Sequence, residues 1–239
     1  MANPLLLKLQ RRDLLPPEEQ EAVEALRGAV RDFVPGDAIV RQGDRPSFSS
    51  VLQSGWAARV KFLADGQRAI SALHLAGDFV DLHSFLLKPM DHSVLALTAC
   101  RILTVPHDQL RVATERHPHL ARVLWLDTLI DSAIQREWIA GLGRRSAASR
   151  LAHLICELLM RCQAVGLADG LGYDLPLTQT LLGDALGITA VHVNRSLQEL
   201  RQNRLIRFEG GRLTIMNWDR LVELADFDPA YLNLTREPR

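Results

Sequence analysis

The sequence predicts an α+β chain in three parts: a jelly-roll-like β-roll of short strands, a long central helix and a C-terminal winged helix-turn-helix. Three observations support this prediction. Glycine-containing turns divide residues 33–105 into short apolar runs, an apolar stripe runs at helical steps from Leu120 to Trp138, and two capped helical segments meet at Gly187 before a hairpin. We place the domains at residues 1–143 and 144–239.

The N-terminal part changes character at about residue 33. Residues 17–32 read as a short amphipathic helix, and the residues that follow contain the turn sequences PGD, QGD, SGW, ADGQ and AGD. These turns recur mostly about 8 to 12 residues apart, and the segments between them, such as AARVKFL, are rich in strand-forming residues. The pattern is typical of many short antiparallel strands and predicts a sandwich or roll.

A long helix is predicted at about residues 117–140. One of its faces repeats at steps of three and four residues: Leu120, Val123, Leu126, Ile130, Ile134 and Trp138. Leu124 and Leu129 lie off this stripe, so the helix is apolar on more than one side. We expect one side to cover the sheet and another to meet a second copy of the chain. The alternative is a helix buried inside a single chain.

The segment GLGRRSAASR at residues 141–150 interrupts this helical pattern. Two glycines flank Leu142, and Ser146 and Ser149 are residue types that cap helices. We therefore predict a hinge near Leu142 and Gly143. A second helix follows, with an apolar face of Leu151, Leu154, Ile155, Leu158 and Leu159.

The stretch LTQTLLGDALGITAVHVNRSLQEL at residues 177–200 predicts a helix-turn-helix. Thr178 is placed to cap a helix that runs to Leu186, and Gly187 can end it in the left-handed conformation. Thr189 then caps a second helix. The expected core between the two helices is Leu182, Leu186, Ile188, Val193 and Leu197. Gly183 lets the helices approach closely.

The second helix, at residues 189–203, has an outer face that suits the DNA major groove. Arg195 can give two hydrogen bonds to guanine, Asn194 or Gln198 can bond adenine, and Val191 can touch a thymine methyl. Thr189 and His192 suit phosphate contacts near the first turn. The candidate DNA-binding residues are Thr178, Thr189, Val191, His192, Asn194, Arg195 and Gln198. The alternative is a two-helix packing unit with a solvated polar face.

The segment RLIRFEGGRLTIMN at residues 204–217 favours the DNA-binding interpretation. Two strand-like runs flank Gly210 and Gly211, which is a hairpin signal. A helix-turn-helix followed by a hairpin is a winged helix. Five arginines face only two acids across residues 195–212: Arg195, Arg201, Arg204, Arg207 and Arg212 against Glu199 and Glu209. This local excess of positive charge suits DNA although the whole chain has a net charge of zero.

Other chemistry is weakly supported. The chain has three cysteines, Cys100, Cys156 and Cys162, without a C-x-x-C pair, so disulfide frameworks and thiolate metal cages are not expected. We find no nucleophile elbow, P-loop or H-E-x-x-H sequence and predict that the chain is not an enzyme. We predict no metal site, although His74, His83 and His92 could cluster in the roll. No signal peptide or membrane span is expected, so the predicted location is the cytoplasm.

The whole layout resembles the Crp/Fnr superfamily of bacterial transcription regulators. The resemblance rests on PGDAIVRQGD and LAGDFVDLHSFLLKPMDHSVLALTAC in the roll, on the central helix with its hinge, and on LTQTLLGDALGITAVHVNRSLQELRQNRLI with the wing. It implies a cyclic-nucleotide-binding-like sensor domain, dimer formation through the central helices and a winged helix that binds a palindromic promoter site. RNA polymerase is an implied partner.

The sequence departs from the family at the implied effector pocket: Gly77, Asp78, His83, His92 and Ser93. Cyclic-nucleotide-binding members have Gly-Glu and Arg-Ser where this chain has Gly77-Asp78 and His92-Ser93. Arginine can donate two hydrogen bonds to a phosphate, whereas a neutral histidine offers fewer donors. Asp81 is expected to add negative charge nearby. We therefore do not expect cyclic AMP as the effector.

Further departures concern cofactors and base recognition. Iron–sulfur members carry an N-terminal cysteine cluster, but no cysteine precedes Cys100, which places this chain in the branch without that centre. His83 lies where haem-sensing members have a histidine. Many members have a glutamate at the position of Val191, so the base preference beside Arg195 should shift toward thymine.

These observations predict a homodimeric, sequence-specific transcription regulator that binds double-stranded DNA and has no cofactor. An unidentified small molecule could act as its effector. The alternative function is a haem- or small-ligand-sensing module that acts mainly through a protein partner. The excess of arginine around the second helix and the wing argues against that alternative.

Overall fold

The computed structural model describes residues 3–238, and contacts divide this part of the chain into two compact units. Unit 1 holds the chain up to Lys61, Ser71–Ser132 and the segment from Asn233. Unit 2 holds Phe62–Ile70 and Ala133–Leu232. One continuous helix, α4 (Pro118–Arg144), contributes to both units. The domain boundary at residues 143–144 stays a prediction.

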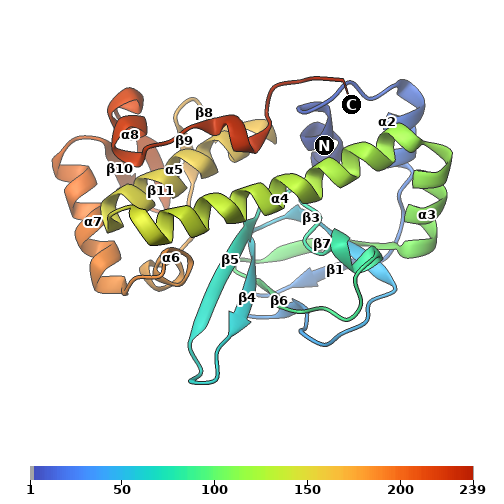
Figure 1. Cartoon of the computed structure of the whole chain (residues 1–239), viewed down its shortest axis with the longest axis horizontal. Coiled ribbons are helices and arrows are strands. Elements are labelled where there is room, and N and C mark those ends of the chain that lie inside the picture. Colours follow the sequence, from blue (N-terminus) through green and yellow to red (C-terminus); the bar gives the residue numbers. More distant parts are fainter. Residues whose placement is uncertain (1–2, 239) are drawn as a thin grey trace. The chain divides into compact units, whose positions relative to one another are not determined.

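Unit 1 is built on two β-sheets, as Figure 1 shows. The sheets have the strand orders β1-β7-β3 and β2-β6-β4-β5, and β7 runs antiparallel to both of its neighbours. The strands are β1 (Val30–Phe33), β2 (Ala38–Val40), β3 (Phe48–Ser54), β4 (Ala57–Phe62), β5 (Arg68–His74), β6 (Ser93–Ala96) and β7 (Cys100–Pro106). The predicted roll of short strands is confirmed.

Four helical segments besides α4 belong to unit 1: α1 (Pro4–Gln10), α2 (Pro17–Glu24), the 3₁₀ helix η1 (Leu82–Phe85) and α3 (His107–Arg116). Helix α1 was not expected from the sequence. The Asn3 side chain accepts hydrogen bonds from the first backbone N–H groups of α1, and Pro4 suits the first helical position. Leu5, Leu6 and Leu9 bury its apolar face.

Two apolar clusters hold unit 1 together. One lies within the roll and contains Val40, Leu52, Ala57, Val80, Met90, Val94, Ala96, Cys100 and Ile102. The other joins α1, α2, α3 and α4 to β3 and β7 through Leu5, Leu6, Leu9, Leu15, Val23, Leu26, Val51, Phe79, Val105, Leu110, Leu120, Val123 and Leu124. The predicted stripe of α4 therefore contributes to the core of this unit, because apolar side chains gain stability when they leave water.

The predicted single helix at residues 17–32 is wrong in its second half. Helix α2 ends at Glu24, and Val30–Phe33 form strand β1 beside β7. Between these elements, a Cβ atom at Gly28 would lie 1.5 Å from the carbonyl oxygen of Thr104. Only glycine permits this approach, and the ladder with β7 satisfies the backbone groups that a longer helix would otherwise have paired internally.

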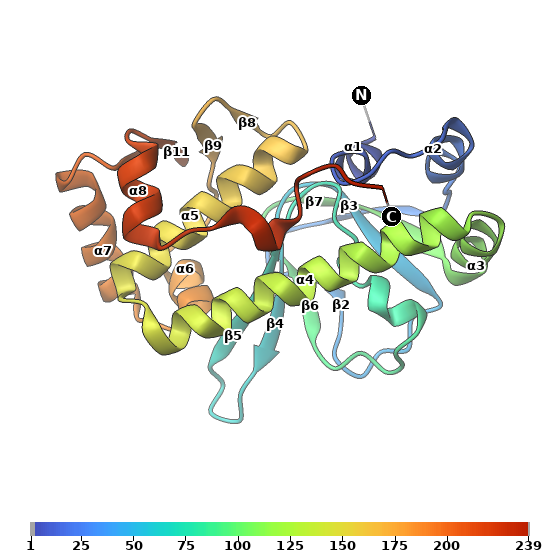
Figure 2. The same ribbon diagram turned by 45° about the horizontal axis from the view of Figure 1, so that its top comes forward.

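Unit 2 packs four helices around α5 (Ala147–Ala164) and carries a small sheet. It contains the second half of α4, β8 (Ala168–Asp169), β9 (Gly172–Asp174), α6 (Gln179–Leu186), α7 (Ala190–Gln202), β10 (Ile206–Glu209), β11 (Arg212–Ile215), α8 (Trp218–Ala225) and η2 (Pro229–Leu232). Figure 2 shows α8 alongside α5. The apolar face predicted for α5 is fully buried. Within residues 3–238, no helix combines the length and apolar character needed to cross a membrane.

The break between α4 and α5 lies later than the predicted hinge. Helix α4 continues to Arg144 instead of ending near residue 140, so Leu142 and Gly143 are helical. The Ser146 side chain caps α5 by accepting the backbone N–H of Ser149 at 3.2 Å. Glycine within a helix costs only about 1 kcal/mol relative to alanine, and the contacts of α4 outweigh this preference.

At the start of α4, His119 links two buried acidic side chains of unit 1. Its Nδ1 lies 2.6 Å from Glu19 Oε2, and its Nε2 lies 3.1 Å from Asp13 Oδ2. Burial lowers the pKa of His119, but the hydrogen bonds to Glu19 and Asp13 outweigh this and hold the pKa above its ordinary value of 6.5. The imidazole therefore joins the segment around α2 to α4 through these two contacts.

We expect unfolding to depend on pH through His119. Because its pKa is raised in the folded protein, its stabilisation is fully present below pH 6.5 and is lost as the pH rises through the higher folded pKa. The urea unfolding free energy of the wild type minus that of His119→Gln should fall as the pH rises above about 6.5. The corresponding difference for His117→Gln is the control. A pH-independent difference for His119→Gln would contradict this role.

Candidate DNA-binding surface and effector pocket

Helices α6 and α7 form the predicted helix-turn-helix. The side chains of Thr178 and Thr189 each accept the backbone N–H of the third residue in the helix that follows. Gly187 ends α6 in the left-handed conformation, with a φ of 62°. The two caps and the glycine therefore confirm the bounds predicted for both helices, because each satisfies a local requirement of a helix end.

The two helices pack closely against each other. Their shared core contains the buried Leu182, Leu186, Val193, Leu197 and Leu200, and Ile188 is half-buried. A Cβ atom at Gly183 would lie 2.5 Å from the carbonyl oxygen of Ile188. The absence of a side chain at residue 183 therefore fixes the distance between α6 and the turn before α7.

The opposite face of α7 is open to solvent. Val191 is 68% exposed, Arg195 and Gln198 are also exposed, and Asn194 is half-buried. The cap residues Thr178 and Thr189 and the first-turn residue His192 are exposed as well. All seven residues expected to contact DNA thus lie at the surface of the helix-turn-helix, and their binding to DNA stays a prediction.

A wing follows α7. Strands β10 and β11 pair antiparallel, and Gly210 and Gly211 make the turn with φ values of 57° and 81°. Positive φ at both positions is the requirement of the hairpin turn that matches strand twist, and glycine meets it without strain. Strand β11 also pairs with β9, so the wing is the edge of a four-stranded sheet.

The arginines of this region fall into two groups. Arg201 donates to the carbonyl oxygen of Phe208 at 3.0 Å, and Arg212 lies 3.3 Å from Asp174. These two side chains hold the wing. Arg195, Arg204 and Arg207 are exposed and are the basic residues available to an anionic partner.

We expect Gly183→Ala to destabilise unit 2. The added methyl would press on a backbone carbonyl, which cannot move without shifting the turn, and overpacking of this kind costs about 1–3 kcal/mol. The measurement is the urea midpoint. Gly143→Ala is the matched control: its methyl meets nothing within 4 Å in α4, so helix propensity should make this variant slightly more stable. Equal midpoints for both variants would contradict the packing argument.

In the predicted effector pocket, Gly77 and Asp78 contact the N-terminal helix. A Cβ atom at Gly77 would lie 2.5 Å from the carbonyl oxygen of Pro4, and Gly77 has a φ of 94°. Asp78 is buried, with one carboxylate oxygen 2.7 Å from Lys8 Nζ and the other accepting the backbone N–H of Leu75 at 2.9 Å. The carboxylate therefore already has partners within the chain.

Asp78 belongs to a buried charge cluster between α1 and α4. Lys8 lies 2.7 Å from Asp127 as well, and Arg12 donates to the same carboxylate. Burial alone would raise the pKa of Asp127, but the positive charges of Lys8 and Arg12 hold it below its ordinary value. Sequence reasoning missed this cluster: it placed Asp78 in the effector pocket, and Lys8, Arg12 and Asp127 stand in no recognisable motif.

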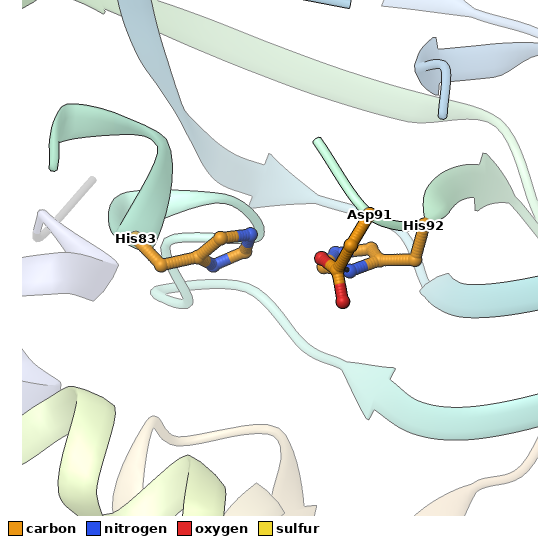
Figure 3. Close-up of side chains that lie close together, drawn as sticks. All are labelled: His83, Asp91 and His92. Carbon is orange, nitrogen blue, oxygen red and sulfur yellow. Dashed lines mark hydrogen bonds and ion pairs between the residues drawn. The ribbon is translucent and has the colours of Figure 1, made fainter. Parts of the chain in front are cut away.

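His83 and His92 meet at a second place in unit 1. Their ring centroids lie 4.9 Å apart, and Figure 3 shows the His83 side chain on η1 directed toward Asp91 and His92, which precede β6. Asp91 Oδ1 accepts a hydrogen bond from His92 Nδ1 at 2.7 Å. His74 instead lies near Asp78, at 3.8 Å. The three histidines considered together in the sequence therefore divide between two sites.

An ion pair lies beside these histidines. Arg59 of β4 lies 2.8 Å from Asp131 of α4, and neither residue was singled out from the sequence. Burial, with the nearby Arg59 charge as the next largest cause, lowers the pKa of His83 to about 4. Burial and then Arg59 lower the pKa of His92 in the same way. Both imidazoles are therefore neutral at pH 7.

Ser93 of the predicted pocket and Asp81, expected near it, also have partners within the chain. Ser93 Oγ accepts the backbone N–H of Gln42 at 2.9 Å. Asp81 is fully buried and accepts the backbone N–H of Ser50. Burial raises the pKa of Asp81 to about 7, so the full negative charge expected there from the sequence is not present at neutral pH.

The cysteines do not fit an iron–sulfur cluster. Cys100 is buried in β7, and Cys156 and Cys162 are buried along α5. Burial raises the pKa of the Cys156 thiol to about 12, which opposes the thiolate form that ligates iron. A cluster held by cysteines alone needs four thiolates, and the sequence contains three.

A β-roll unit and a winged helix-turn-helix with an exposed basic face together define a DNA-binding regulator. Two family models match the corresponding parts of the chain. Residues 30–117 match the cyclic nucleotide-binding domain, and residues 149–224 match the Crp-like helix-turn-helix domain.

Known proteins extend this match over most of the chain. A probable transcriptional activator of Rhizobium leguminosarum bv. viciae is 31% identical over 78% of this chain and 76% of its own length. The transcriptional activator protein FnrL of Cereibacter sphaeroides is 28% identical over 88% of this chain and 86% of its own length. The structure of FixK2 from Bradyrhizobium japonicum has a TM-score of 0.74 at 25% identity, over 83% of this chain and 98% of FixK2.

The chain belongs to the Crp/Fnr family of DNA-binding transcription regulators, and the members that it matches are regulators of transcription and not enzymes.

Proposed function

We propose that the protein is a homodimer that binds a palindromic promoter site through α7 and its wing. The observation that carries this proposal is the exposed face of α7, where Val191, Arg195 and Gln198 stand clear of the core beside a basic hairpin. Two such helices in a symmetric dimer read half-sites one helical turn apart, about 34 Å. The protein acts in the cytoplasm, where such DNA is available.

The side chains of α7 divide into two roles. Arg195 gives two hydrogen bonds to guanine, Asn194 or Gln198 bonds adenine, and Val191 contacts a thymine methyl. Thr178, Thr189 and His192 contact phosphates at the exposed ends of the helices. Arg204 and Arg207 add sequence-independent attraction, which weakens as salt rises because condensed counterions are released on binding.

Arg195→Ala should abolish sequence-specific binding and leave the oligomeric state unchanged. Losing a two-bond contact to guanine costs about 1–3 kcal/mol of discrimination at that base pair. The measurement is selection from a randomised duplex pool at fixed salt, followed by sequencing. Arg101→Ala, which removes an equal charge at an exposed position of β7, is the control and should recover the wild-type palindrome. Recovery of the same palindrome by Arg195→Ala would refute the assignment of α7.

The dimer rests on an apolar face of α4 that the chain itself does not cover. Of the stripe predicted from the sequence, Leu120, Val123, Ile130 and Ile134 are buried within the chain. A different line of the helix is exposed: Trp125 at 65%, Leu129 at 49% and Ile139 at 67%. Exposed apolar surface of this extent on one helix favours a second copy as the partner.

Ile139→Glu should shift the protein from dimer to monomer, because it places a charge in the proposed helix–helix contact. Sedimentation equilibrium over a range of concentrations measures this. Val34→Glu, at a side chain that is 64% exposed in the turn after β1, is the control and should leave the dimer intact. A dimer of unchanged affinity in Ile139→Glu would place the interface elsewhere.

We do not expect cyclic AMP, haem or an iron–sulfur cluster to be the effector. The Asp78 carboxylate is engaged by Lys8, and the Pro4 carbonyl lies against Gly77. A haem bound through His83 would have to displace the His92 ring, 4.9 Å away. The relatives named above are transcriptional activators, which supports activation through RNA polymerase for this chain.

A further inference from the structure

Three side chains with metal-binding groups converge in unit 1. His83 comes from η1, and Asp91 and His92 come from the segment before β6, as Figure 3 shows. One ligand atom from each residue can be chosen so that all three lie within 4.8 Å of one another. This arrangement brings two imidazoles and one carboxylate to a common point from two different segments.

The two imidazoles carry an unused buried atom. His83 Nε2 and His92 Nε2 are buried, and neither has a hydrogen-bond partner among residues 3–238. Buried polar atoms in folded proteins almost always have a partner, so two unsatisfied nitrogens side by side call for a ligand. A neutral imidazole retains a nitrogen lone pair, and this is the form in which histidine binds metal ions.

The surrounding charges allow a cation at this place. The Arg59 charge is balanced by Asp131, 2.8 Å away. Lys61 donates to the backbone carbonyl of Asp91 at 2.7 Å, and its exposed position lets water screen its charge. The Asp91 carboxylate, 80% exposed and 2.7 Å from His92 Nδ1, supplies negative charge at the site itself.

We propose that His83, Asp91 and His92 bind a divalent transition-metal ion of the zinc or ferrous type, through two imidazole nitrogens and one carboxylate oxygen. Imidazole favours these ions over Mg²⁺ and Ca²⁺, which take oxygen ligands. Three protein ligands leave a coordination position open for water or a small anion.

Only small side-chain movements are needed to close the site. In a tetrahedral zinc site with bonds of about 2.0–2.1 Å, the ligand atoms lie roughly 3.4 Å apart. The atoms here lie within 4.8 Å, so each must approach by about 1 Å or less. The exposed Asp91 side chain is free to rotate from its hydrogen bond with His92 to the ion.

The site is tested by metal titration of the full chain without DNA. After chelator treatment, Zn²⁺ binding is measured by calorimetry, and Co²⁺ binding by the visible absorption bands that report its ligands. We expect one ion per chain, with affinity at least about tenfold lower in His83→Ala and Asp91→Asn. His117→Ala is the control and should bind as the wild type does.

Asp91→Asn keeps this test independent of folding, because the side chain is exposed and the substitution preserves its shape. A circular dichroism spectrum checks that the variant is folded. Equal affinities in the wild type, His83→Ala and Asp91→Asn would overturn the site, as would the absence of binding in the wild type.

The ion also serves as the effector of the regulator, a role that rests on the proposed function. An effector acts only if it binds the two DNA-binding states with different affinity, and typical couplings change affinity about 5- to 150-fold. Fluorescence anisotropy on the selected duplex, with Zn²⁺ or with chelator, should show a change of at least about fivefold in the wild type and His117→Ala. Asp91→Asn should show none.

These outcomes separate the two claims. Equal DNA affinity with Zn²⁺ and with chelator in the wild type would overturn the effector role. Failure of every variant to bind DNA under both conditions would count against the proposed function, and the DNA-free titration would still decide whether the metal site exists.

Discussion

The close approach of α6 to the turn before α7 is the constraint on which the DNA-binding surface depends. At Gly183 the backbone comes so near to the carbonyl oxygen of Ile188 that no side chain fits between them. With that distance fixed, Val193, Leu197 and Leu200 reach the core, and the helical period turns Val191, Arg195 and Gln198 outward. The same packing that stabilises the unit therefore decides which side chains can meet a base pair.

Unit 1 buries a cluster of charged side chains between α1 and α4. Lys8 of α1 and Arg12, just after this helix, reach Asp78 and Asp127, so these carboxylates are buried as members of a paired cluster. Breaking one partner of such a cluster is costly because it leaves an uncompensated charge. This arrangement commits Asp78 to holding α1 in place, whereas the buried Nε2 atoms of His83 and His92 have no hydrogen-bond partner among residues 3–238.

The chain thus has the fold of the family, but the side chains at His83, Asp91 and His92 give it binding groups of a different kind. Regulators of this kind need only a ligand that binds two states unequally, and the fold does not dictate which ligand that is. In this chain the groups offered are two neutral imidazoles and a carboxylate, with Arg59 neutralised by Asp131. Two imidazoles and a carboxylate are ligand types for a transition-metal ion, and Asp131 already engages Arg59, the charged donor that a phosphate would need.

The sequence by itself determined the features that depend on local spacing. Thr178, Gly187 and Thr189 marked the helix ends, and Gly210 with Gly211 marked the wing, since caps and positive-φ turns are requirements of a few adjacent residues.

Only the tertiary structure decided the rest. The close approach of Gly28 to Thr104 accompanies strand β1, where the sequence predicted the second half of a helix. Helix α4 continues through the residues predicted as a hinge. Asp78 forms an ion pair with Lys8, and His83 lies close to Asp91 and His92. The partners in most of these contacts come from segments far apart in the chain, and only folding brings them within bonding distance.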